Sequence, residues 1–363
     1  MSSILFIVDD LGKGGAEKVT ADLANTLADL GHSVTLAVLN GSKDTQAIKS
    51  HVQYIDLNIS PSFAFGKLWK AKKLSPIEEN RIEQLINQQR YDLIILGFHN
   101  GYYLGHYLKQ TQNVWYWIHG ELLEYRPSAN IFKRIKENIR QIKHQAKFKR
   151  LFHQKNLITV NQDLKLKYQS LLPNSQIRHI ANGVSITQKN MTSSLDKIWD
   201  VIFVGRLVAI KQIDHAITAF AQSGLKGRMA IVGEGPQKQE LMALVQKLNI
   251  EDRVDFLGWA DDPYPYIQQS KALILTSYYE SFGLVLAESL CLGTPVIAYH
   301  CSQGVKDILS YQEDMKSFLI DANNCEQLST QLYRCVNHPY AILEETKNQL
   351  SIQHTAQQFL ALI

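Results

Sequence analysis

The stretch KALILTSYYESFGLVLAESLCLGTPVIAY, Lys271–Tyr299, contains one complete unit of an α/β fold. Its apolar start, KALILTS, predicts a buried strand, and YYESFG is the loop that follows. LVLAESLCL predicts a helix, which Gly293 and Pro295 end before a second strand, TPVIAY. A strand, a helix and another strand in this order form a βαβ unit, which places both strands in one parallel sheet.

The same alternation continues in both directions along the chain. Strands are predicted for ILFIVD, SVTLAVL, DLIILGF, NVWYWIHG and NLITVN in the first half, and for WDVIFVGRL, RMAIVGEG and RVDFLG in the second. Two such series in tandem predict an α/β protein with two facing Rossmann-like domains, which bind ligands at the carboxyl ends of their strands. We place the first domain at residues 1–182 and the second at residues 183–345. The last helix, in residues 346–363, is a candidate to cross back onto the first domain.

Length and composition narrow the class of protein. The chain has 363 residues, of which 45% are hydrophobic and 20% charged, as is usual for a two-domain soluble protein. No apolar run reaches about 18 residues, so no transmembrane helix is expected. The start, MSSILFIVDD, reads as a first strand and not as a signal peptide. The four cysteines form no CxxC pair, which favours reduced thiols in the cytoplasm.

The net charge of +4 is spread unevenly. Residues 1–182 hold 24 Lys and Arg against 15 Asp and Glu, a net charge of +9. Residues 183–363 hold 14 against 19, a net charge of −5. A basic first half indicates that this part of the chain meets something anionic.

Two glutamates surround the Ser-Phe-Gly turn of the opening stretch. Glu280 lies in the loop, and Glu288 lies inside a mostly apolar helix whose first backbone N–H groups come from Phe282, Gly283 and Leu284. A carboxylate buried there without partners would cost several kcal/mol. Two vicinal sugar hydroxyls would satisfy it, as a ribose does. The alternative is a helix-start acid together with an exposed acid.

Two cations follow an earlier strand, in VGRLVAIKQ. Arg206 and Lys211 lie just after the predicted strand end at Gly205. Arg can hold a phosphate in a fork, and Lys adds a mobile point charge, so the pair could bind a diphosphate. The alternative is two solvated surface cations.

Two glycine-rich turns also follow strands. Gly14 and Gly15 open a helix and expose backbone N–H groups to an anion, although Glu17 breaks the dinucleotide fingerprint GxGxxG. Gly233 and Gly235 would let a flat base approach the backbone, with Pro236 at the first helical position. Tight turns without a ligand are the alternative in both places.

Histidines end two of the apolar runs in the first half. His119 follows NVWYWI, so its imidazole should emerge at the carboxyl end of a strand, which favours a role in a site. His99 has a similar position and is the weaker candidate. A packed, hydrogen-bonded histidine is the alternative for each.

A basic segment spans Ile131–Lys155. It carries nine Lys and Arg and one acid, Glu137, with isoleucines close to one helical face. Such a helix can lie on an anionic membrane surface, or it can pack its apolar stripe on the sheet and solvate its charges. The loop Ser60–Lys73 adds three aromatic side chains that look exposed among lysines: Phe63, Phe65 and Trp69.

The ordered set of motifs resembles the retaining glycosyltransferases of family 4, which have the GT-B fold. The matching elements are GKGGAEKV, IHG, NGV, VGRL with Lys211, VGEGP, VDFLGW and ESFGLVLAE, and they span nearly the whole chain. Within them, the two glutamates eight positions apart around an SFG turn are specific.

The resemblance implies a role for each residue. Arg206 and Lys211 would bind the donor diphosphate with the backbone of Gly14–Gly15 and of Phe282–Leu284, Glu288 would hold the nucleotide ribose, and Glu280 would contact the donor sugar. The backbone near Gly233 would face the base, and His119 would lie beside the transferred sugar. The catalytic set is therefore His119, Arg206, Lys211 and Glu280.

The resemblance also implies a reaction and its partners. A hexose or N-acetylhexosamine would pass with retention from a nucleotide-sugar, with UDP the first choice of base, to a lipid-linked, lipopolysaccharide or capsule acceptor. Neither a metal nor another cofactor would be needed, and nucleic acid is not an expected partner. We expect an enzyme of the cytoplasm that attaches to the inner face of the membrane through residues 131–155. The rivals are a GT-B epimerase or phosphorylase and a non-catalytic partner subunit.

Overall fold

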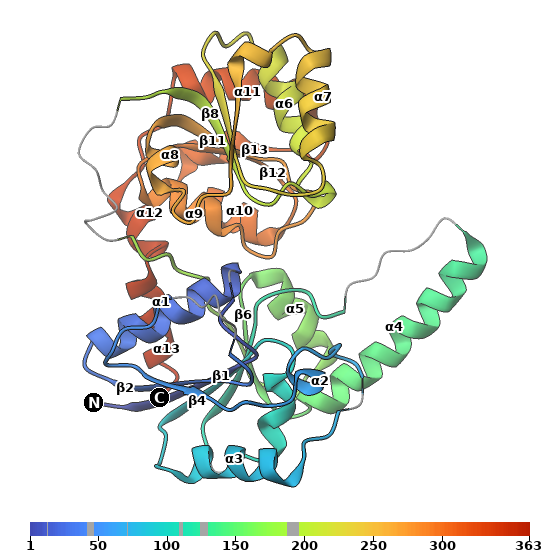
Figure 1. The fold of residues 1–363 in the computed structure, drawn as a ribbon, viewed down its shortest axis with the longest axis vertical. Helices are drawn as coiled ribbons and strands as arrows, with labels where there is room; N and C mark the ends of the chain where they lie inside the picture. The colour runs from blue at the N-terminus through green and yellow to red at the C-terminus, as the bar shows by residue number, and fades with distance from the viewer. Residues whose placement is uncertain (13, 42–46, 71, 109–111, 124–129, 187–195) are drawn as a thin grey trace. The chain divides into compact units, whose positions relative to one another are not determined.

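The computed structural model describes residues 1–12, 14–41, 47–70, 72–108, 112–123, 130–186 and 196–363. The chain divides into two compact units (Figure 1). The first consists of Met1–Ala181 with Thr355–Ile363, and the second is Asn182–His354. The chain returns to the first unit at Thr355 and not at residue 346, so helix α12 (Glu344–Gln349) stays with the second unit.

A seven-stranded parallel sheet forms the core of the first unit, in the order β3-β2-β1-β4-β5-β6-β7. The strands are β1 (Ser3–Val8), β2 (Ser33–Val38), β3 (Gln53–Asp56), β4 (Leu93–Gly97), β5 (Val114–Ile118), β6 (Asn156–Thr159) and β7 (Ile177–His179). The helices are α1 (Gly15–Asp29), α2 (Pro61–Ala64), α3 (Pro76–Asn87), the 3-10 helix η1 (Gly101–His106), α4 (Ile131–Phe152), α5 (Gln162–Leu171) and α13 (Ile352–Leu360). The strand order reverses between β1 and β4, where such sheets bind ligands.

Helix α13 is part of the first unit over most of its length. The ring of Phe359 meets Trp117 of β5 edge to face, with ring centroids 4.9 Å apart. Asn113 Nδ2 donates to the carbonyl of Leu362 (2.8 Å), and Thr355 Oγ1 donates to the carbonyl of Ala181 (3.0 Å). The end of the chain therefore packs beside the central strands of the first sheet.

A six-stranded parallel sheet forms the second unit, in the order β10-β9-β8-β11-β12-β13. The strands are β8 (Trp199–Val204), β9 (Met229–Val232), β10 (Val254–Gly258), β11 (Ser270–Leu275), β12 (Val296–Tyr299) and β13 (Leu319–Ile320). Helices α6 (Ile213–Gln222), α7 (Lys238–Lys247) and α11 (Cys325–Asn337) form one layer, and α8 (Tyr264–Gln268), α9 (Leu284–Cys291) and α10 (Gln303–Leu309) form the other (Figure 1). The short 3-10 helices are η3 (Ala209–Lys211), η4 (Glu251–Arg253) and η5 (Glu313–Phe318). The prediction of two parallel Rossmann-like sheets is thus confirmed.

Two local predictions were wrong. Helix α7 begins at Lys238 and not at Pro236. Gln237 N donates to the carbonyl of Leu207 (3.1 Å), which holds the turn before the helix against the loop after β8. Phe63 of α2 is buried and not exposed, whereas Phe65 is 54% exposed. The amino group of Lys72 lies 5.7 Å from the centre of the Phe63 ring.

Glu78 of α3 joins two ends of the loop in which Phe63 lies. Its carboxylate accepts from Ser60 N and from Ser75 N, both at 2.6 Å, and from Ser75 Oγ at 2.8 Å. These hydrogen bonds, with that from Ser75 N the strongest cause, lower the pKa of Glu78 to about 2. The ionised form is therefore more stable in the folded than in the unfolded protein.

We expect Glu78→Gln to lower the free energy of unfolding by about 2 kcal/mol at neutral pH, because it leaves one backbone N–H without a charged acceptor. The difference from wild type should shrink as the pH falls from 4.5 towards 2, where Glu78 itself becomes protonated. Urea unfolding across this pH range measures both effects. Glu83→Gln, at an exposed position of the same helix, is the matched control. An equal loss in both variants would contradict the role of Glu78.

Candidate active site

A lysine and a glutamate meet at the carboxyl edge of the second sheet. Lys211 Nζ, from η3 after β8, forms an ion pair with Glu280 Oε1, from the loop after β11. Ser277 Oγ donates to the same carboxylate oxygen (2.8 Å). The Lys211 and Glu280 side chains are only 21% and 17% exposed, so the pair is partly shielded from water. The pair lies at the reversal between β8 and β11, the expected position for a ligand in this fold.

The backbone around this pair is tied together across the two loops. Thr276 Oγ1 donates to the carbonyl of Lys211 (3.1 Å), and Tyr278 N donates to the carbonyl of Ile210 (2.7 Å). Gln212, at the end of η3, adopts a left-handed conformation with φ of +45° before α6 begins. These contacts position Lys211 towards Glu280, although 69 residues separate the two in the sequence.

Glu288 is buried on α9 and is 8% exposed. The hydroxyl of Tyr264, from α8, donates to Glu288 Oε1 (3.2 Å). The sequence predicted burial on an apolar helix but missed this tyrosine. A bound ribose would therefore share Glu288 with a protein hydroxyl.

Arg206 and the start of α9 lie on the same unit. Arg206 is exposed, and its guanidinium makes no hydrogen bond or ion pair with another described residue. Gly283 precedes α9 with φ of +94°, which only glycine adopts without strain. Among the described residues, no hydrogen-bond acceptor is found for the backbone N–H groups of Phe282, Gly283 and Leu284. These groups and the guanidinium can bind an anion.

Close packing of the backbone requires a glycine at position 233. Gly233 has φ of +144°, and a Cβ at this position would overlap the carbonyl oxygen of Gly205. Gly233 N also donates to the carbonyl of Gly258 (2.7 Å). The ends of β8, β9 and β10 thus meet backbone to backbone at this glycine.

The glycine turn of the first unit carries a carboxylate of its own. Gly14 precedes α1, and the Glu17 carboxylate lies against it, where a Gly14 Cβ would be. Burial raises the pKa of Glu17. Gly14 N already donates to the carbonyl of Gly12 (2.9 Å). A diphosphate that reached the N–H group of Gly15 would meet the Glu17 carboxylate, which the sequence did not predict.

His119 lies at the end of β5, as expected, but its ring is enclosed. It stacks on Phe98 with ring centroids 5.3 Å apart, and the Trp117 ring is 4.1 Å away. Burial, with a smaller effect of His99, lowers the pKa of His119 to about 3, so the imidazole is neutral at physiological pH. Both ring nitrogens are buried without a hydrogen-bond partner among the described residues. A buried polar ring without partners can accept a ligand hydroxyl.

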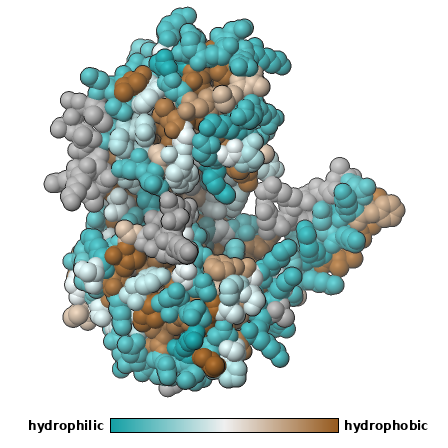
Figure 2. Space-filling model, viewed as in Figure 1, coloured by the Kyte–Doolittle hydropathy of each residue, from teal (hydrophilic) through white to brown (hydrophobic). Residues whose placement is uncertain are grey.

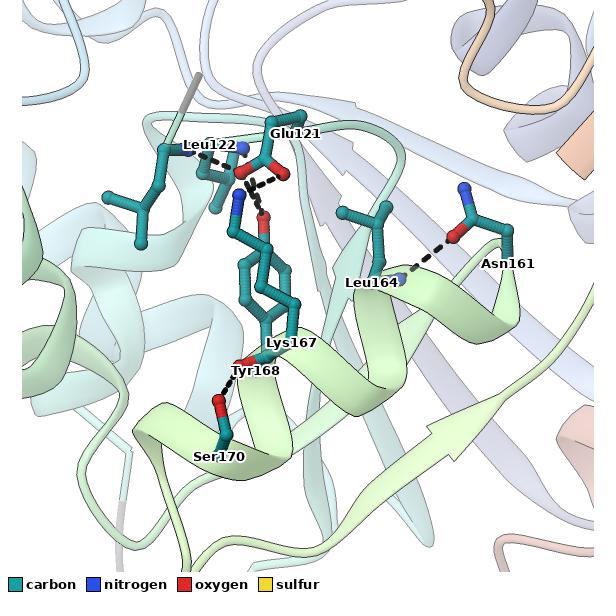
Figure 3. Close-up of polar contacts among 8 residues, drawn as sticks. Glu121, Leu122, Asn161, Leu164, Lys167, Tyr168 and Ser170 are labelled. Atoms are coloured by element: carbon teal, nitrogen blue, oxygen red, sulfur yellow. Dashed lines mark hydrogen bonds and ion pairs between the residues drawn. The ribbon is translucent and has the colours of Figure 1, made fainter. Parts of the chain in front are cut away.

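The segment after His119 is anchored to α5 (Figure 3). Glu121 accepts from Lys167 Nζ (2.6 Å) and from the hydroxyl of Tyr168 (3.3 Å). The same hydroxyl accepts from Leu122 N (3.0 Å). These contacts hold the backbone that leaves β5 and so limit where His119 can lie.

Asp9, at the carboxyl end of β1, was missed in the sequence. Its carboxylate accepts from Asn100 N (2.9 Å), Asn100 Nδ2 (2.8 Å) and Gly101 N (2.8 Å) after β4. Burial raises the pKa of Asp9 to about 6 in spite of these hydrogen bonds. Asp9 therefore joins the two strands at which the first sheet reverses.

The sequence also did not predict that Cys301 lies near Glu280. Burial raises the pKa of its thiol to about 12, and the nearby Glu280 carboxylate adds to this rise.

Among the described residues, no group of three or more His, Cys, Asp or Glu side chains could hold a metal ion.

Helix α4 buries only its last turns against the first unit, through Phe148 and Phe152. Its first half extends beyond the body of this unit, and hydrophobic side chains lie on it among polar ones (Figures 1 and 2). The exposed stripe consists of Ile131, Phe132, Ile135, Ile139 and Ile142, which are between 49% and 79% exposed. No helix in the described parts of the chain is long and apolar enough to span a bilayer.

Two family models match the chain. The model for glycosyltransferase family 4 matches residues 13–188, and that for glycosyl transferases group 1 matches residues 175–353. Together they cover both units from residue 13 to residue 353. The chain is therefore a glycosyltransferase, and it belongs to the family 4 enzymes that its motifs resemble.

Individual relatives agree with this assignment. One relative is N-acetylgalactosamine-N,N'-diacetylbacillosaminyl-diphospho-undecaprenol 4-alpha-N-acetylgalactosaminyltransferase of Campylobacter jejuni. The two chains are 24% identical over 333 aligned residues, which make up 89% of this chain and 87% of the relative. Sucrose-phosphate synthase of Thermosynechococcus elongatus has a similar fold, with a TM-score of 0.74, 20% identity and coverage of 100% and 98%. Anabaena HepE, solved with UDP and glucose, gives a TM-score of 0.70, 19% identity and 99% coverage of both chains. The GT-B fold is thereby confirmed.

Proposed function

We propose that this enzyme transfers a hexose or N-acetylhexosamine from a UDP-sugar, with retention of anomeric configuration and without a metal. The observation that carries the proposal is the shielded Lys211–Glu280 pair at the reversal of the second sheet. A cation next to a carboxylate suits a donor that has a diphosphate and several hydroxyls. The UDP bound to Anabaena HepE supports the choice of nucleotide.

The residues divide the work of the reaction as follows. Arg206, Lys211 and the N–H groups that open α9 stabilise the negative charge that develops on the diphosphate as the C1–O bond breaks. Glu280 contacts hydroxyls of the donor sugar, and Glu288 holds the ribose. His119, neutral at physiological pH, accepts from a hydroxyl of the transferred sugar. The acceptor hydroxyl attacks from the same face, and a leaving phosphate oxygen takes its proton.

The acceptor is a lipid-linked or lipopolysaccharide-type glycan at the inner face of the cytoplasmic membrane. The relative from Campylobacter jejuni is named for a diphospho-undecaprenol acceptor. In the present chain, the exposed stripe of α4 and the nine Lys and Arg of residues 131–155 suit an anionic bilayer surface.

A thermal-shift comparison of nucleotides, followed by turnover of UDP-hexoses with membrane extract, tests the donor and the reaction. UDP should raise the midpoint of unfolding more than GDP does. Transfer to a membrane glycan with the anomeric configuration unchanged, and in the presence of EDTA, is the expected result. Inversion of configuration, or loss of transfer in EDTA, would contradict the proposed chemistry. Binding of UDP without turnover of any UDP-sugar would favour a non-catalytic partner subunit.

Flotation with liposomes that contain anionic lipid tests the attachment. Replacing Ile135, Ile139 and Ile142 by serine should weaken binding at least about tenfold, because each isoleucine loses apolar area that the bilayer would bury. Binding by wild type should also fall as salt rises. The matched control replaces three other exposed apolar side chains of the first unit by serine: Leu30, Ile77 and Leu166. Equal binding by all three proteins would reject the role of α4.

A further inference from the structure

A basic pocket lies at the foot of α4, where the helix joins the first unit. Its volume is about 410 Å³, and it is formed by the second half of α4, by η1 and by the segment after α2. The described residues that line it include four cations and no Asp or Glu; the cations are Lys70, Lys147, Arg150 and Lys155. None of the residues assigned to donor binding lines this pocket.

Aromatic side chains give the pocket defined walls. Lys147 Nζ donates to the carbonyl of Trp69 (2.5 Å), and the Trp69 ring lies 5.7 Å from that of His144. The Tyr103 hydroxyl donates to the carbonyl of Leu68. Burial raises the pKa of Tyr103, and the nearby charge of Arg150 partly offsets this rise. The hydrogen bond to Trp69 thus fixes the position of the Lys147 amino group. The other three cations, Lys70, Arg150 and Lys155, form no ion pair with another described residue.

Cations gathered without carboxylates repel one another unless an anion joins them. A phosphate group fits this chemistry, because Arg can grip it with two N–H groups while lysines add point charges. The aromatic walls suit the glycerol or acyl part next to a headgroup phosphate.

One of the cations that line the pocket, Arg150, lies on the side of α4 that carries the apolar stripe. Arg150 follows Ile139 by eleven residues, about three helical turns, so both side chains lie along one line of the helix. A bilayer that buried Ile139 would therefore bring headgroups near Arg150.

We propose that this pocket binds the phosphate group of an anionic membrane lipid, and that it favours a phosphomonoester headgroup over a phosphodiester. The pocket thereby fixes the position of the first unit on the bilayer in addition to the general attraction of its charges. The inference rests on the membrane attachment proposed above.

The test compares vesicles that contain phosphatidic acid with vesicles that contain phosphatidylglycerol, matched for net surface charge. We expect wild type to bind the phosphatidic acid vesicles about tenfold more tightly, because a phosphomonoester offers the pocket cations one more charged oxygen, and a charge-assisted hydrogen bond contributes on this order. A pocket variant with Lys70→Gln, Arg150→Gln and Lys155→Gln should lose this preference. The control removes three charges of α4 outside the pocket, Lys133→Gln, Lys143→Gln and Lys149→Gln, and should bind both vesicles more weakly while keeping the preference.

Each outcome of the vesicle experiment supports or overturns the pocket as a lipid-binding site. An unchanged preference in the pocket variant, with an unchanged midpoint of thermal unfolding, overturns the pocket alone and leaves the attachment intact. Wild type that binds no vesicle overturns the attachment as well. Calorimetric titration of wild type and of the pocket variant with inorganic pyrophosphate distinguishes a lipid headgroup from a soluble phosphate as the ligand. Binding of pyrophosphate by wild type that the pocket variant loses, without any preference of wild type among vesicles, would assign the pocket to a soluble phosphate and reject the lipid.

Discussion

Lys211→Ala is expected to lower kcat/KM for sugar transfer by about 100- to 1000-fold, the range seen when one preorganised group that stabilises transition-state charge is removed. The reason is local. Lys211 is the partner of Glu280 in a partly shielded pair, and no other described cation forms an ion pair with that carboxylate. Its loss removes a positive charge from the proposed diphosphate site and leaves Glu280 with Ser277. Steady-state kinetics with the UDP-sugar identified by turnover measure the effect.

Glu280→Gln should lower the rate by a similar factor while keeping the contact with Ser277, because the amide oxygen can still accept that hydrogen bond. Lys316→Ala is the control, since Lys316 forms an exposed pair with Glu313 in the same unit. Arg206→Ala completes the series. Near wild-type transfer in the variants at 206, 211 and 280 would refute the assignment of the site.

Gly233→Ala is expected to destabilise the second unit by more than about 3 kcal/mol. The new methyl group would overlap the Gly205 carbonyl oxygen, and a backbone φ of +144° is strained for alanine. Neither neighbour can move easily, because Gly233 N is hydrogen-bonded to the Gly258 carbonyl and Gly205 N to the Val232 carbonyl. Urea unfolding monitored by circular dichroism measures the loss.

Gly224→Ala separates strain from overlap in this experiment. Gly224 also has a positive φ, of +78°, but nothing lies within 4 Å of the position its Cβ would take. This variant should lose only the conformational cost, about 1 kcal/mol. Equal losses at the two positions would show that the approach of Gly233 to Gly205 does not matter.

Much of the candidate site could be predicted from local patterns. The strand that ends at Leu275 and the helix that starts at Leu284 follow from apolar runs and a glycine, and they place Glu280 in the loop between them. The resemblance then assigned Glu280 and Lys211, which lies 69 residues earlier, to one nucleotide-sugar, and the structure brings the two side chains together. One expectation was wrong and two contacts were missed, for a common reason. Phe63 is buried, Glu17 lies against the glycine turn, and Glu288 has a tyrosine partner, all through packing that the local sequence does not show.

By itself, the order of apolar runs, glycines and charges determined two parallel α/β sheets, because strand and helix periodicity depends on near neighbours along the chain. Only the tertiary structure decided that His119 has buried nitrogens without hydrogen-bond partners among the described residues, that Asp9 joins β1 to β4, and that the stripe of α4 stays exposed beside a basic pocket. Burial and hydrogen-bond partners depend on which distant segments meet, and those meetings are set by the packing of the whole unit.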